Sequence, residues 1–209
     1  MSGQPDKVLL ELNSAIRLQP NYEGFRFDLA QFTLGVAYYG QVRYDDAVRA
    51  FLTTIDLAPD VPQPYRFLGE MLEHARSHLQ QINAKCVAAE RSEPLNPYAP
   101  LLRAKALIAQ LGMADWDDNA REAARLLEKA IALKGDMADA YFDLGCLMDR
   151  KKDYSKAAEL LQKSIQLKAD DPVAHYRLAR TYLQLGKKEQ AAAEFALHAR
   201  LTRRTELLP

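Results

Sequence analysis

The sequence predicts an all-α fold, a solenoid of antiparallel helix pairs. Three observations support this. A pattern of small and apolar residues recurs at intervals of 34 residues, each repeat splits into two windows with apolar residues three and four apart, and a short polar turn joins the two windows. Two helices joined so tightly pack antiparallel, and such a pair buries its apolar face only against neighbouring pairs. We therefore expect about eleven helices in a single solenoid over residues 1–209.

The repeat is clearest in residues 28–61. Gly35 is followed three residues later by Tyr38, and the second window contains Phe51 and is closed by Pro59. The small residue lets the paired helix approach closely, while Phe51 fills the gap opposite. Pro59 ends the second helix because proline cannot continue a helix.

The same slots recur along the chain at the 34-residue spacing. Gly69, Gly145 and Ala179 take the place of Gly35 in the later repeats. We expect Gly35, Gly69 and Gly145 to lie at close helix crossings. Four repeats are placed in this way, at residues 28–61, 62–96, 138–171 and 172–204. The second of them is less regular, because residues 80–90 fit the second-helix pattern only with a one-residue shift.

This pattern resembles the tetratricopeptide repeat (TPR) family over about four-fifths of the chain. The resemblance implies a right-handed superhelix. It also implies that the first helix of each repeat lines a concave groove, which binds an extended or helical peptide segment.

A fifth repeat, residues 97–137, departs from the pattern. Its first helix, expected over 101–111, lacks the Leu-Gly pair, and the turn over 112–119 is about six residues longer than the repeat allows. Asp117 and Asp118 are suited to cap the second helix, which we expect to begin near Asn119. Trp116 lies in this turn and marks an alternative place for recognition.

The two ends of the chain are also irregular. Residues 5–20 match the second helix of a repeat, but no first helix precedes them, and no polar capping helix follows the last repeat. We expect a piece of a longer protein, or ends that another chain covers, with a possible homo-oligomer through the N-terminal helix. The opening residues have no basic and apolar leader pattern, so we expect a cytoplasmic protein. The alternative is an exported protein whose leader is absent from this sequence.

The composition of the chain limits the classes of partner that we expect it to bind. Twenty-eight Lys and Arg balance 28 Asp and Glu, so there is no overall field to attract a polyanion, and the basic clusters are too short for nucleic acid. Charges interrupt every apolar stretch, which argues against membrane insertion. Cys86 and Cys146 form no CxxC pair, which favours buried thiols in a reducing compartment.

No motif indicates catalysis or a cofactor. The chain lacks a GxSxG, a glycine-rich phosphate loop and a CxxC pair, so we predict that it is not an enzyme. Glu70, His74 and His78 would share a face if one helix ran through all three. An ordinary surface helix explains them better, because structural zinc takes four ligands and this HxxxH lacks the adjacent glutamate of metalloproteases. We therefore predict no metal site.

The family resemblance places particular side chains in the groove. Aromatic rings there would act as anchors, and charges would set the register of a bound peptide. Val173 and Leu183 occupy two further groove slots of the last repeat. The candidate groove residues are Tyr39, Arg66, Glu70, Phe142, Asp149, Tyr176 and Arg180.

Two further considerations bear on which residues of the groove are open to a peptide and which peptide they would bind. Phe32 and Val36 occupy groove slots of the first repeat, but we expect the helix over residues 7–18 to bury them. A clamp for the C-terminal carboxylate of heat-shock chaperones, known from co-chaperones of the family, is disfavoured. Its slots hold Phe32 and Val36 in the first repeat, and only Arg177 and Arg180 form a basic pair at suitable spacing.

The sequence thus predicts a non-enzymatic protein–protein interaction scaffold that binds a polypeptide segment of an unidentified protein. The alternative is a self-associating structural segment of a longer TPR protein.

Overall fold

A computed structural model describes residue 14 and residues 27–112 and 116–206. These residues contain ten α-helices and one short 3-10 helix, and no strand. The all-α fold class is therefore confirmed. The expected helix over residues 5–20 lies outside the described residues except for Ser14, and so does any association through it. The chain divides into two compact units, Met1–Ala109 and Gln110–Pro209, which are considered separately below.

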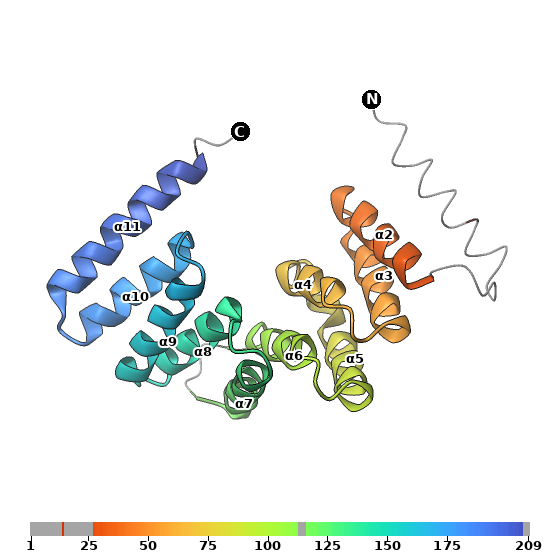
Figure 1. The fold of residues 1–209 in the computed structure, drawn as a ribbon, viewed down its shortest axis with the longest axis horizontal. Coiled ribbons are helices and arrows are strands. Elements are labelled where there is room, and N and C mark those ends of the chain that lie inside the picture. The colour runs from red at the N-terminus through yellow and green to blue at the C-terminus, as the bar shows by residue number, and fades with distance from the viewer. Residues whose placement is uncertain (1–13, 15–26, 113–115, 207–209) are drawn as a thin grey trace. The chain divides into compact units, whose positions relative to one another are not determined.

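The described part of unit 1 runs from red to green in Figure 1. Helices α2 and α3 form the first antiparallel pair, and α5 packs against α6. The elements of unit 1 are α2 (Phe27–Gly40), α3 (Tyr44–Leu57), α4 (Gln63–Glu70), the 3-10 helix η1 (Arg76–His78), α5 (Leu79–Ser92) and α6 (Tyr98–Ile108).

The first repeat matches its prediction closely. A Cβ atom on Gly35 would lie 2.5 Å from a ring carbon of Phe51, so α2 and α3 cross closely at this slot. Phe51 is completely buried, and its ring lies 5.8 Å from that of Phe32 and 5.1 Å from that of Phe67. The aromatic residues of α2, α3 and α4 thus form one core.

The second repeat departs from the prediction because α4 is only eight residues long. It ends at Glu70, and turns and η1 lead to α5. Helix α4 packs against α3 and α6. A Cβ atom on Gly69 would therefore meet Lys105 Cδ of α6 at 3.4 Å, which is an ordinary contact. The expectation of a close crossing at Gly69 is wrong, because α4 stops one residue later and its neighbour there is α6.

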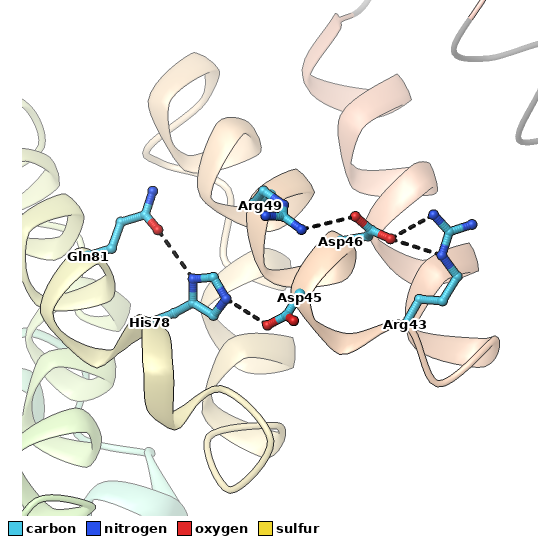
Figure 2. A network of polar contacts seen from close by, with 6 residues as sticks. All are labelled: Arg43, Asp45, Asp46, Arg49, His78 and Gln81. Atoms are coloured by element: carbon cyan, nitrogen blue, oxygen red, sulfur yellow. Dashed lines mark hydrogen bonds and ion pairs between the residues drawn. The ribbon is translucent and has the colours of Figure 1, made fainter.

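Side chains of α3 hold the segment that follows α4. The His74 ring stacks on the Tyr44 ring, with centroids 4.0 Å apart and planes 9° apart. His78 Nε2 lies 2.8 Å from Asp45 Oδ1, and Figure 2 shows this contact beside the separate cluster of Asp46 with its two arginines. These two contacts attach both ends of residues 74–78 to the first turn of α3.

The described part of unit 2 runs from green to blue in Figure 1. Helices α8 and α9 form one antiparallel pair, and α10 and α11 form the next. The elements are α7 (Asp118–Leu133), α8 (Ala138–Arg150), α9 (Tyr154–Leu167), α10 (Pro172–Gln184) and α11 (Lys188–Glu206). Within the described ranges, no helix has the length and apolar character that a membrane span needs.

The irregular fifth repeat is confirmed at its second helix and shifted at its first. Asp117 caps α7, because its Oδ1 accepts a hydrogen bond from the Ala120 N–H at 2.8 Å. Helix α6 begins at Tyr98, three residues before the expected start, and Asn96 Oδ1 accepts the Tyr98 N–H at 2.8 Å. The pair Asn96-Pro97 directly before the helix therefore marks its start, and the repeat pattern of small residues does not include this pair.

Unit 2 contains the second close crossing. A Cβ atom on Gly145 of α8 would lie 2.8 Å from Leu161 Cγ and 3.3 Å from the Leu161 backbone nitrogen. Leu161 is fully buried and forms a core with Leu178 and Tyr182. The expected close crossing at Gly145 is confirmed.

The turns inside the three most regular repeats share one backbone feature. Val42, Lys152 and Gly186 all have positive φ values, of 63°, 66° and 74°. They occupy the same slot of their repeats. In each turn the next residue donates its N–H to a carbonyl near the end of the first helix, as Arg43 does to Tyr38 at 2.9 Å. This is the Schellman geometry that closes a helix with a left-handed residue.

Candidate peptide-binding face

The sequence before α10 sets where this helix begins. Pro172 is its first residue, and the fixed φ of proline suits the first turn. Asp171 Oδ1 accepts hydrogen bonds from the N–H groups of Val173 at 2.9 Å and Ala174 at 3.2 Å. Asp171 and Pro172 therefore fix the residue at which α10 begins, and with it the direction in which each of its side chains points.

One side of α10 is buried against its neighbours. Leu178 and Tyr182 belong to the core of unit 2, and burial raises the pKa of the Tyr182 hydroxyl. His175 is also buried, with Nδ1 2.5 Å from Glu194 Oε2 on α11 and Nε2 3.1 Å from the Ala169 carbonyl oxygen. These contacts hold α10 against α11.

The other side of α10 is exposed although it carries large apolar side chains. Val173 is 51% exposed, Tyr176 37% and Leu183 48%. Together with Arg180 they follow the spacing i, i+3, i+7 and i+10, which places all four on one stripe of the helix. We use the name α10 face for Val173, Tyr176, Arg177, Arg180 and Leu183.

Tyr176 is held in place by α11. Its ring meets the Phe195 ring edge-on at 5.9 Å and the His198 ring at 5.3 Å. His198 Nδ1 in turn donates to the Pro172 carbonyl oxygen at 2.9 Å. The Arg180 guanidinium carbon lies 6.0 Å from the centre of the Tyr176 ring. Tyr176 is therefore supported on one side and open on the other, which suits a rigid aromatic anchor.

The candidate residues of α8 have different surroundings. Phe142 is half-buried and packs against the core around Leu161. Asp149 Oδ1 accepts a hydrogen bond from Thr181 Oγ1 of α10 at 3.0 Å. The structure thus places Tyr176 and Arg180 together and brings Asp149 against α10, while Phe142 contributes mainly to packing.

In unit 1 the candidates are divided between core and surface. Tyr39 is half-buried, with its ring 5.9 Å from that of Tyr44 and 5.8 Å from that of Phe67. Arg66 and Glu70 are exposed one turn apart on α4. Glu70 lines a shallow pocket of about 200 Å³ between α4 and α6. Tyr39 is therefore mainly a packing residue, and the two charged residues are available at the surface.

We expected the helix over residues 7–18 to bury Phe32 and Val36 of the first repeat. Phe32 is half-buried by the rings of Phe51 and Phe67, which lie within unit 1. Val36 remains 38% exposed. Cover by residues 7–18 falls outside the described residues.

The Glu70, His74 and His78 arrangement does not exist as one helical face. Helix α4 ends at Glu70, so the three side chains do not follow one helical stripe. His74 stacks on Tyr44, and His78 contacts Asp45. Among the residues that the structure describes, no three His, Cys, Asp or Glu side chains gather as a metal ion would require.

The long turn before α7 has contacts of its own. Lys151 Nζ lies 5.2 Å from the centre of the Trp116 ring, and Arg121 Nη1 donates to the Trp116 carbonyl oxygen at 3.3 Å. Trp116 is half-buried, and it offers less open apolar surface than the α10 face.

Sequence reasoning placed Tyr176 and Arg180 but missed what supports them. Phe195 takes the slot that Phe51 fills in the first repeat, and His198 follows it three residues later. Their spacing of three residues on α11 puts both on one helical face, and this was the available signal.

The fold and this face define a class: a helical-repeat protein that presents an ordered surface. Models of the tetratricopeptide repeat match residues 32–100, 117–172 and 150–205. The chain belongs to the tetratricopeptide repeat family. Repeats of this family form protein-interaction scaffolds, and this chain shares that general character. Members of the family are typically without enzymatic activity.

Solved structures show the same fold at low sequence identity. A TPR protein from Thermus thermophilus, TTC0263, superposes with a TM-score of 0.63 at 20% identity, over 86% of this chain and 100% of the other. A MamA protein gives 0.60 at 19% identity, over 88% and 96%. MamA from Desulfovibrio magneticus, residues 41 to the end, gives 0.62 at 18% identity, over 86% and 97%. A search of curated proteins found no match.

Proposed function

We propose that the protein is a non-enzymatic scaffold that binds a polypeptide segment against α10, with α8 beside it. The observation that supports this most directly is the exposed apolar stripe Val173, Tyr176 and Leu183 on a helix whose opposite side is firmly packed. Exposed apolar side chains grouped on one rigid element are typical of an interaction surface.

The arrangement around Tyr176 fits binding in a further respect. Its ring is already supported by Phe195 and His198, so little side-chain freedom is lost when a partner covers it. Arg180 beside the ring can grip a carbonyl or carboxylate of the bound segment, which would set its register. Few residues of this kind carry most of the affinity in protein interfaces.

A cytoplasmic location fits this proposal. Cys86 and Cys146 form no disulfide bond, and burial raises the pKa of the Cys86 thiol well above its ordinary value. Buried thiols of this kind persist most readily in a reducing compartment.

The test is selection of peptides from a random 12-residue display library, followed by fluorescence polarisation with the selected peptides. The double variant Tyr176→Ala/Leu183→Ala should weaken binding by roughly tenfold or more, as expected for an aromatic anchor. The matched control is Leu57→Ala/Leu95→Ala, which truncates two exposed apolar residues of unit 1. Circular dichroism checks that both variants keep their helix content. Unchanged binding by the α10 variant would contradict the proposal and direct attention to the turn around Trp116.

A further inference from the structure

The last repeat is strongly basic although the chain as a whole is neutral. Residues 172–204 contain seven Lys and Arg but only two Asp and Glu, against 28 of each kind in the full sequence. The seven basic residues are Arg177, Arg180, Lys187, Lys188, Arg200, Arg203 and Arg204.

This positive charge is not neutralised within the repeat. None of the seven basic side chains forms an ion pair with the described residues. Of the two acidic residues, Glu194 is largely buried and contacts His175 at 2.5 Å. Glu189 alone is exposed. In other repeats, by contrast, basic side chains such as Lys85 are paired with carboxylates, here that of Asp56.

Two of the uncompensated charges lie on the α10 face. Arg177 and Arg180 are both exposed and lie between the apolar residues Tyr176 and Leu183 along the helix. Asp149 of α8 accepts a hydrogen bond from the Thr181 hydroxyl and keeps its negative charge, but it does not belong to the α10 face. Both charged residues of the α10 face itself are positive.

Resting on the proposed function, we propose that the α10 face binds a polypeptide segment in which carboxylate side chains alternate with apolar ones. The apolar side chains pack on Tyr176 and Leu183, and the carboxylates meet Arg177 and Arg180. The remaining basic residues of the repeat strengthen the positive potential that attracts such a segment and speed its association.

The test uses three fluorescent 12-residue peptides with the same leucine and phenylalanine positions. The polar positions are all Glu, all Gln or all Lys, and every peptide is amidated so that no terminal carboxylate takes part. Fluorescence polarisation is measured with the full chain at 50 and 500 mM salt. The Glu peptide should bind roughly fivefold more tightly than the Gln peptide at low salt, because two partly exposed charge pairs are added. This preference should shrink at high salt.

Variants identify the residues responsible. Arg177→Glu/Arg180→Glu should reverse the preference, so that the Lys peptide binds most tightly. The control Arg91→Glu/Lys163→Glu makes the same change in net charge at exposed positions of other repeats and should keep the preference for Glu. Tyr176→Ala should weaken the binding of the Glu peptide and of the Gln peptide by the same factor.

The outcomes separate this inference from the proposed function. Equal binding of the Glu and Gln peptides overturns the acidic partner but leaves a peptide-binding face. Failure of the full chain to bind any of the three peptides counts against both. The first repeat, residues 28–61, has five acidic against two basic residues, so a second copy is another possible occupant. Light scattering that shows self-association, abolished by Arg177→Glu/Arg180→Glu, would assign the face to that copy and overturn the separate acidic partner.

Discussion

Gly145 and Gly69 occupy the same slot of the repeat but meet different neighbours. At Gly145 a Cβ atom would press on the Leu161 side chain and approach its backbone nitrogen, which cannot move aside easily. At Gly69 the nearest atom is the flexible Lys105 stem at 3.4 Å. The two residues therefore differ in whether glycine is required.

The first prediction follows from that difference. Gly145→Ala should lower the free energy of unfolding by roughly 1–3 kcal/mol through overpacking, less the small gain from higher helix propensity. Gly69→Ala is the matched control and should be neutral or slightly stabilising, because its Cβ meets no rigid atom. Urea denaturation followed by circular dichroism measures both. Equal effects at the two positions would contradict the different crossings described here.

Val42 is the least suitable residue in the left-handed turn slot. A β-branched side chain disfavours positive φ, whereas glycine at Gly186 accepts it without strain. Val42 is also 67% exposed, so its side chain contributes little burial in return.

The second prediction is that Val42→Gly raises the free energy of unfolding by roughly 1 kcal/mol, because relief of the left-handed strain exceeds the entropy that glycine adds to the unfolded chain. Gly186→Val should act in the opposite direction in the last repeat. The melting temperatures of the two variants provide the measurement. A destabilised Val42→Gly protein would show that the turn is not strained.

At the scale of elements, α4 and the residues after it show how distant contacts override a local pattern. The repeat pattern predicts a first helix of ordinary length in residues 62–96, yet the helix ends at Glu70. Tyr44 and Asp45 of α3 instead hold residues 74–78 in place. Periodicity describes only neighbours along the chain, so it could not reveal these contacts across about 30 residues.

The third prediction tests this attachment. Asp45→Ala removes the acceptor of His78 and should speed amide hydrogen exchange in residues 74–78 by about two- to fivefold, as expected for one exposed polar contact. Asp46→Ala is the control, because Asp46 lies in the same first turn of α3 but pairs with Arg43 and Arg49 (Figure 2). Exchange in residues 74–78 that is equally fast in both variants would mean that the contact with His78 has no special role.

Elsewhere the elements followed from the sequence because their signals are local. Residues only a few positions apart predicted the helix pairs of three repeats, 28–61, 138–171 and 172–204. They also predicted the Asp117 cap. The side chains of the α10 stripe occupy groove slots that the family resemblance implied. The support of this stripe by Phe195 depends on the packing of α11, which the pattern of one helix does not contain.

At the scale of the whole molecule, the division into two compact units has a thermodynamic consequence. Unit 2 has its own buried core around Leu161, Leu178 and Tyr182. A unit with its own core can fold independently.

The fourth prediction is that residues 110–209, expressed alone, form a helical protein with a cooperative thermal transition. Gly145→Ala should lower the melting temperature of this fragment, because the crossing lies entirely within it. Differential scanning calorimetry of the fragment and of the full chain is the measurement. A fragment without a cooperative transition would show that its core needs residues 1–109.

The single tryptophan of the chain, Trp116, lies in unit 2, where the Lys151 ammonium approaches its ring. Tryptophan emission is therefore a built-in spectroscopic reporter of the region around α7 and α8, whereas the circular dichroism signal averages over all helices. If the two units melt at different temperatures, the two optical signals will give different midpoints on the same sample. Emission alone would then describe half of the molecule, and a change confined to unit 1, such as Val42→Gly, would leave it unaltered.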